Sequence, residues 1–229
     1  MSIGTGKTEL EDGIKLFRNE NYQEAIDSLE KNFENKNDVE SGYHLALAYA
    51  QIQNYDKTLE TFDKIMRRLD NPLRIMQAHI IVGYIYAVKE MYDLAEFELL
   101  DALASGIENT QIYSVLGYIY YKKNNTRKAI DSLRKAVALD SQSANARNSL
   151  GFILADSGIN IEEGISEIKK ALNTDPKNPA YLDSLGWAFF KKNDINNAKE
   201  FLTKAFEIAP TNKDIKEHLI KLDQLGYKK

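Results

Sequence analysis

The sequence predicts an all-α fold, a solenoid of antiparallel helix pairs, from three observations. A glycine or alanine, preceded by a large apolar residue in five of its six copies, recurs about every 34 residues. Behind each motif, small and large apolar residues follow at helical spacings. The chain of 229 residues has 12 glycines and only 4 prolines, which is too little turn-forming sequence for a fold of many short strands.

The repeat is defined by a small residue that we call the anchor. Consecutive anchors are 33, 37, 34, 34 and 35 residues apart. The six anchors are Gly13, Ala46, Gly83, Gly117, Gly151 and Gly186.

A second set of positions indicates a second helix in each unit. Twelve residues after the anchor, or 13 in the fifth unit, stand Ala25, Thr58, Ala95, Ala129, Gly164 and Ala198. Four residues later stand Leu29, Phe62, Leu99, Leu133, Ile168 and Leu202. Spacings of three and four residues place such side chains on one buried helical face. We therefore expect small residues to let the paired helices approach closely, while large residues fill the adjacent space.

The units follow one another without a linker, so we expect a single domain over residues 1–229. The expected repeats cover 6–38, 39–74, 76–109, 110–143, 144–178 and 179–212. Pro176 and Pro210 stand where a second helix must end. Residues 213–225 have apolar residues at helical spacing and are expected to form a capping helix. The stretch Arg67–Arg74, where the spacing grows to 37, is expected to be a lengthened second helix followed by a loop.

This pattern resembles the tetratricopeptide repeat. The tryptophan that often precedes the anchor by four residues in that family is replaced here by His79, Tyr113, Arg147 and Leu182. The resemblance implies a right-handed superhelix, with first helices on its concave face and second helices on its convex face. It also implies a non-enzymatic protein that binds other proteins.

Composition argues against several other functions. Lys+Arg number 30 and Asp+Glu 34, so the formal net charge is −4, which disfavours nucleic acid and anionic membranes as partners. No apolar run reaches the roughly 18 residues of a membrane span. The first ten residues contain no secretory signal, so we expect a cytoplasmic protein, or one of the cell envelope if a signal or anchor has been removed. The high content of Lys, Asn and Ile is typical of an AT-rich bacterial genome.

Catalytic, metal-binding and cofactor-binding residues are not expected. The chain has no cysteine, which excludes thiol nucleophiles, and its three histidines lie in different repeats. The segment Gly4–Thr8 resembles the end of a phosphate-binding loop, but it lacks the upstream glycine and the preceding strand.

The candidate partner-binding residues lie on the first helices. On the concave face that the resemblance implies, the position after the anchor is aromatic in four consecutive repeats, and polar residues stand one turn before it. The candidates are Tyr43, Tyr84, Tyr118, Tyr121, Asn145, Asn148, Ser149, Phe152, Asp183, Trp187 and Phe190. Either the rings pack between neighbouring first helices, or they form an aromatic floor that binds an extended peptide or a helix.

One subclass of the family is disfavoured. The carboxylate clamp that holds chaperone C-termini needs lysine, arginine and asparagine at fixed groove positions. Here the matching positions hold Leu10, Ile14, His44, Gln77 and Ile81. We therefore expect an adaptor or scaffold for a protein or peptide partner. The alternatives are a self-associating structural component and an accessory module of a multiprotein complex, such as one of the cell envelope.

Overall fold

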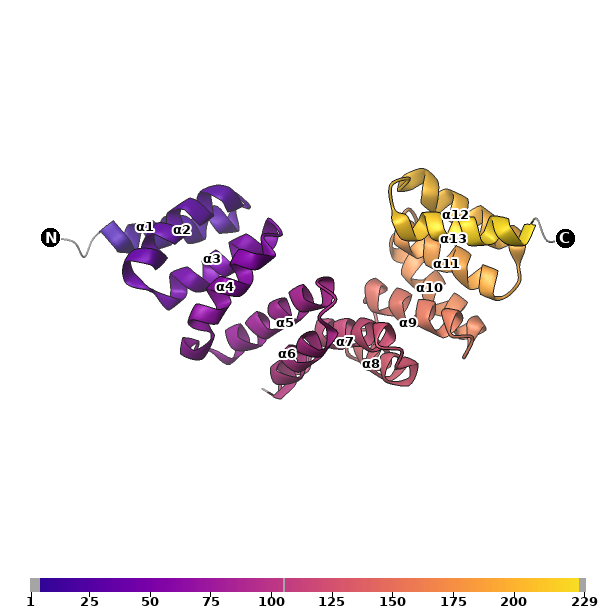
Figure 1. Cartoon of the computed structure of the whole chain (residues 1–229), viewed down its shortest axis with the longest axis horizontal. Helices are drawn as coiled ribbons and strands as arrows, with labels where there is room; N and C mark the ends of the chain where they lie inside the picture. The colour runs from indigo at the N-terminus through magenta and orange to yellow at the C-terminus, as the bar shows by residue number, and fades with distance from the viewer. Residues whose placement is uncertain (1–4, 105, 227–229) are drawn as a thin grey trace. The chain divides into compact units, whose positions relative to one another are not determined.

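The computed structural model describes residues 5–104 and 106–226, which form helices joined by short turns (Figure 1). No strand occurs in these ranges, so the predicted all-α fold of helix pairs is confirmed. The phosphate-loop-like segment begins at Gly4, which lies outside the described residues. The helices are α1 Thr5–Arg18, α2 Tyr22–Lys36, α3 Val39–Gln51, α4 Tyr55–Ile65, α5 Pro72–Val88, α6 Tyr92–Ala104, α7 Thr110–Lys122, α8 Thr126–Leu139, α9 Ala144–Asp156, α10 Ile161–Thr174, α11 Pro179–Lys191, α12 Ile195–Ile208 and α13 Lys213–Gly226.

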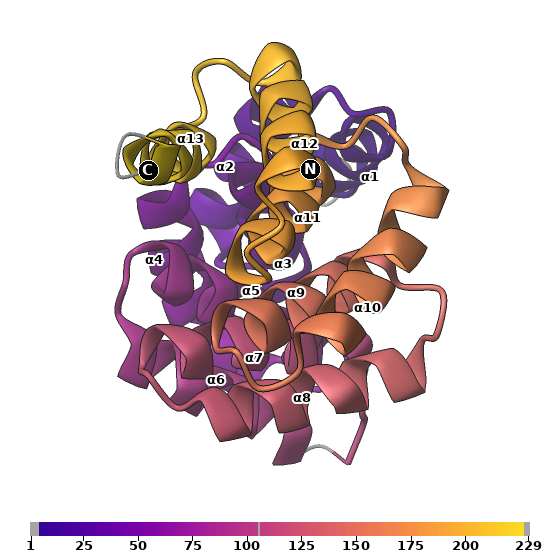
Figure 2. The same ribbon diagram turned by 90° about the vertical axis from the view of Figure 1, so that its right-hand side faces the viewer.

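The helices belong to two compact units, residues 1–107 and residues 108–229. The first unit contains the pairs α1/α2, α3/α4 and α5/α6. The second contains α7/α8, α9/α10 and α11/α12, and α13 packs against both helices of the last pair. The pairs α9/α10 and α11/α12 can be followed in Figure 2.

Asparagine side chains begin many of the helices. Asn54 and Asn125 each accept a hydrogen bond from the backbone N–H three residues later. Asn178 accepts from two N–H groups at the start of α11, where Pro179 occupies the first helical position. Such caps satisfy the backbone donors that a helix leaves unpaired at its N-terminus. These short polar residues therefore fix where one helix ends and the next begins.

A left-handed residue lies in the turn inside every pair. It stands seven positions after each anchor, at Glu20, Gln53, Glu90, Asn124, Gly158 and Asn193, with φ between 58° and 70°. The next N–H usually bonds back to the first helix, as Asn125 N–H does to the Tyr120 carbonyl at 2.8 Å. In the fifth repeat this bond comes from Asn160, one residue later. The inserted residue there accounts for the 13-residue spacing in the sequence.

The glycine anchors face the second helix of their own pair, as the pattern predicts. A Cβ atom at Gly117 would lie 2.5 Å from Cγ of Leu133. At Gly151 it would lie 2.5 Å from the carbonyl oxygen of Gly164, so the backbones of α9 and α10 are in direct contact there. Only residues without a side chain permit this approach.

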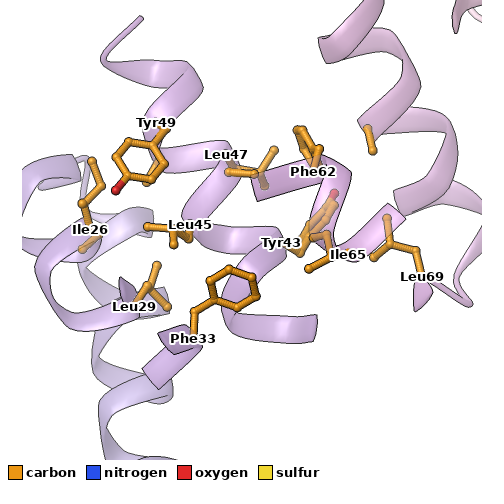
Figure 3. Close-up of a cluster of buried hydrophobic side chains, with 14 of the residues drawn as sticks. Ile26, Leu29, Phe33, Tyr43, Leu45, Leu47, Tyr49, Phe62, Ile65 and Leu69 are labelled. Atoms are coloured by element: carbon orange, nitrogen blue, oxygen red, sulfur yellow. The ribbon is translucent and has the colours of Figure 1, made fainter. Parts of the chain in front are cut away.

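The core of the first unit brings together side chains from α2, α3 and α4. Phe33, Leu45, Phe62 and Ile65 are buried there (Figure 3). Burying each such side chain contributes roughly 1.5–3 kcal/mol. Tyr43, a candidate groove residue, belongs to the same cluster, so its ring packs between helices.

The stretch Arg67–Arg74 differs from the prediction. The second helix α4 is not lengthened, because it ends at Ile65 and is followed by a single 3₁₀ turn, Met66–Arg68. Pro72 then starts α5, and Asn71 caps it, since proline suits the first turn of a helix. The added residues therefore lie in the 3₁₀ turn and the short link to α5, not in α4.

Candidate functional site

A groove of about 490 Å³ lies in the second unit. Its walls come from the first helices α7, α9 and α11 and from α13. The lining residues are Tyr118, Tyr121, Lys122, Asn148, Ser149, Phe152, Ile153, Ala180, Asp183, Ser184, Asn212, Asp214, Ile215, Glu217, His218 and Lys221.

The structure brings six of the eleven candidate residues together in this groove. They are Tyr118, Tyr121, Asn148, Ser149, Phe152 and Asp183. Three further candidates, Asn145, Trp187 and Phe190, lie in the same unit but outside the lining. The remaining two, Tyr43 and Tyr84, belong to the first unit.

Two aromatic rings, Tyr118 and Phe152, contribute to the apolar part of the groove. Tyr118 is 44% exposed, and the Lys122 ammonium lies 5.6 Å from the centre of its ring. Phe152 is half-buried and meets the Tyr121 ring edge to face at 6.0 Å. Tyr118 and Phe152 stand at the same position of successive repeats, one residue after the anchor. The groove therefore offers ring surface to a bound molecule.

The carboxylate of Asp156 holds the rings on either side of it. It accepts hydrogen bonds from the Tyr121 hydroxyl at 2.6 Å and the Trp187 indole N–H at 2.8 Å. The Lys191 ammonium lies 3.4 Å away. Burial alone would raise the pKa of the Asp156 carboxyl, but these two hydrogen bonds and the lysine charge together lower it below its ordinary value. Asp156 therefore ties α7 to α11 in its charged form.

Trp187 is packed within the wall and does not lie on an open floor. It is only 7% exposed, and its ring stacks with Phe190 at 4.8 Å and with His218 at 4.1 Å. Tyr43 in the first unit is similarly buried, and its hydroxyl donates to Gln77 at 2.7 Å. Tyr118 and Tyr84, by contrast, are exposed. Trp187 and Tyr43 therefore fit the interpretation in which the rings pack between helices. Tyr118 and Tyr84 have the exposed ring surface that the binding interpretation requires.

Helix α13 contributes residues that sequence reasoning missed. Nδ1 of His218 lies 2.9 Å from Oδ2 of Asp183, and the imidazole also stacks on Trp187. His218 stands 35 residues after Asp183, which is one repeat length. Continuing the repeat spacing into the capping helix would have predicted that His218 lies beside the last first helix.

Asn148 carries an unsatisfied polar atom in the groove wall. Its Oδ1 is buried, and no hydrogen-bond partner for it occurs in the part of the chain that the structure describes. A buried acceptor without a partner costs roughly 1–3 kcal/mol. A donor of a bound molecule would remove that cost once the Asn148 amide turned towards the groove.

The rim of the groove carries charges of both signs. Lys122 and Lys221 are exposed, and so are Asp214 and Glu217. Across the described ranges, no three histidine, cysteine or acidic side chains are placed to hold a metal ion. Over the same residues, none of the helices is both long and apolar enough to span a bilayer.

The helix pairs recur at a fixed spacing, and the glycine anchors touch the partner helix of each pair. These features define a helical-repeat protein, and its second unit has a groove along the first helices. Sequence models of the repeat match three stretches, described as "TPR repeat" over residues 117–158 and "Tetratricopeptide repeat" over residues 40–69 and 180–212. The chain is a tetratricopeptide-repeat protein, and repeats of this family are protein–protein interaction modules.

Known proteins with this repeat resemble the chain at modest identity. A TPR repeat-containing protein of Pseudomonas aeruginosa is 25% identical over 177 residues, which are 74% of this chain and 30% of that protein. The chain spans between 27% and 33% of the length of the curated relatives it matches.

Solved structures share the fold. The crystal structure of YrrB, described as a TPR protein with an unusual peptide-binding site, superposes with a TM-score of 0.60 at 26% identity. The superposition covers 82% of this chain and 96% of YrrB. The Pseudomonas aeruginosa PilF structure gives a TM-score of 0.74 at 14% identity, covering 94% of this chain and 97% of that one.

Proposed function

We propose that the chain is a non-enzymatic adaptor that binds an extended peptide segment of a partner protein in the groove of its second unit. The observation that carries this proposal is the convergence of exposed Tyr118, half-buried Phe152 and the unsatisfied Asn148 Oδ1 in one groove. Tyr43, Tyr84, Asn145, Trp187 and Phe190 are not part of the contact surface that we propose.

The groove fits a peptide in both size and chemistry. A cavity of about 490 Å³ is large enough for a short segment of a few residues. Aromatic side chains are frequent energetic anchors of interfaces. With the Asn148 amide turned towards the groove, a backbone N–H of the peptide would satisfy its oxygen, while an apolar side chain of the peptide would cover Tyr118 and Phe152.

The similarity to YrrB supports this assignment, since that protein has a peptide-binding site on the same kind of repeat array. The mixed charge of the rim favours a peptide that carries both acidic and basic groups. The positions of the chaperone-tail clamp lack its lysines and arginines, so we propose a partner other than a chaperone C-terminus.

The test is a peptide selected against the whole chain from a random display library and then synthesised. Its affinity is measured by isothermal titration calorimetry for wild type, Tyr118→Ala and Asn148→Ala. We expect Tyr118→Ala to weaken binding about 30-fold, which corresponds to about 2 kcal/mol. We expect Asn148→Ala to weaken it about tenfold, because a hydrogen bond of the complex is lost.

The matched control is Asp131→Ala, which changes an exposed side chain on the second helix α8, outside the groove. Its affinity should equal that of wild type. Equal binding by wild type and both groove variants would refute the proposed site. The melting temperatures of all four proteins show whether a loss of binding comes from unfolding.

A further inference from the structure

The outward positions of the second helices reveal one exceptional repeat. These positions stand one residue before, two residues after and five residues after the small residue that faces the anchor. In five repeats they hold charged or polar residues throughout, for example Lys128, Asp131 and Arg134 in α8. In α6 they hold Leu94, Phe97 and Leu100. We call these three residues the α6 ridge.

The α6 ridge is exposed and is not part of the buried face of α6. Leu94, Phe97 and Leu100 are 44%, 58% and 47% exposed. The buried face of α6 consists of other residues, Ala95, Leu99 and Ala102, and Leu99 is the residue that meets the anchor Gly83. The apolar residues of the ridge are therefore additional to those that form the helix pair.

We propose that the α6 ridge binds an amphipathic helix of a partner protein, one that carries lysine or arginine beside its apolar stripe. Residues three apart on a helix form a ridge that packs into the groove of a second helix. A cluster of exposed apolar side chains is typical of an interaction surface. The ridge belongs to the first unit and shares no residue with the proposed peptide groove of the second unit.

Charge identifies the kind of partner. Helix α6 contains four carboxylates and no lysine or arginine. Glu90 and Asp101, each four residues from a member of the ridge, are both exposed. Basic side chains on the partner would pair with these two carboxylates. A second copy docked through the same face would bring like charges together, and an anionic lipid surface would be repelled.

The experiment uses the full chain and two synthetic 18-residue amphipathic peptides with the same leucine stripe. One peptide has lysines beside the stripe, and the other has glutamates. We expect the lysine peptide to bind wild type, and Phe97→Asp and Leu100→Asn each to weaken it at least about tenfold. Asp101→Lys should weaken the lysine peptide and strengthen the glutamate peptide. Asp131→Ala, at the position of α8 that matches Phe97, should change neither affinity.

Three results would overturn the proposal. The first is equal affinity of the two peptides for wild type, or no binding of the lysine peptide. The second is a large fall in melting temperature for both Phe97→Asp and Leu100→Asn, which would mean that the ridge is part of the folded interior. The third is a concentration-dependent mass by light scattering that Phe97→Asp abolishes, because the occupant would then be a second copy of the chain.

Discussion

Single side chains one repeat length apart join neighbouring first helices, and they also join the last first helix to α13. Tyr121 bonds to Asp156, Tyr43 to Gln77, and His218 to Asp183, at separations of 34 or 35 residues. Distance from the anchor fixes the face of a first helix, so Tyr118 and Phe152 could be predicted as groove residues. The burial of Trp187 could not be predicted in this way, because it depends on the packing of α13. No glycine or alanine stands in α13 one repeat length after the anchor Gly186.

Asp156→Ala should destabilise the second unit by about 1–3 kcal/mol. The substitution leaves the Tyr121 hydroxyl and the Trp187 N–H without their acceptor, and unsatisfied buried donors carry a cost of that size. Urea unfolding followed by circular dichroism measures the change. An unchanged midpoint would show that these hydrogen bonds do not stabilise the unit.

The same residue should make stability depend on acid. The pKa of Asp156 is lower in the folded protein than its ordinary value, so the unfolded chain binds the proton more tightly. The stabilising contribution is complete above the unfolded pKa, which is about 3.9, and is lost as the pH falls through the folded value. The stability difference between wild type and Asp156→Ala should therefore shrink below about pH 4. A constant difference between pH 6 and pH 3 would contradict this.

At the scale of elements, the helix pairs depend on a turn with one left-handed residue. The sequence did not reveal that the seventh residue after every anchor has a positive φ. The residues there are of different kinds, including Glu20 and Gln53, and only Gly158 is a glycine. Because no shared residue type marks the position, the backbone conformation was not visible in the sequence pattern.

Gln53→Gly should stabilise the protein by about 0.5–1 kcal/mol. Gln53 has a φ of 58°, a conformation that costs a residue with a Cβ roughly 1–2 kcal/mol, and glycine's added freedom in the unfolded chain offsets part of that gain. The control Gln51→Gly, in the last turn of α3, should destabilise instead. Thermal melts of both variants distinguish the two signs, and destabilisation by Gln53→Gly would contradict the strain assigned to this turn.

Gly151→Ala tests the closest helix contact. A methyl group there would meet the Gly164 carbonyl oxygen at 2.5 Å, and backbone atoms cannot rotate away. Overpacking costs about 1–3 kcal/mol, which exceeds the gain of up to about 1 kcal/mol in helix propensity, so the melting temperature should fall. The control Ser166→Ala changes an exposed position of α10 and should leave it unchanged or slightly higher. A rise for Gly151→Ala would show that α9 and α10 pack less closely.

At the scale of the whole molecule, the regular spacing made the fold predictable. Six anchors defined six helix pairs, although the 3₁₀ turn after α4 and the division into two compact units were not foreseen. That residues 1–229 behave as one domain remains a prediction of the sequence.

Repeats contact mainly their neighbours, so damage should stay local. In Gly151→Ala, hydrogen exchange followed by mass spectrometry should speed up in α9 and α10 and, to a smaller extent, in the adjacent helices of the second unit. Exchange in α1 to α4 should stay close to wild type. Equal acceleration along the whole chain would mean that the chain unfolds as one cooperative block.

The claim that a partner peptide lies in the groove of the second unit is tested most directly by site-specific photocrosslinking. A benzophenone amino acid is placed at position 118 in the groove or at position 131 on α8, and each protein is irradiated with the selected peptide. We expect crosslinks from position 118 and none from position 131. Crosslinks from position 131 but not from position 118 would contradict the account.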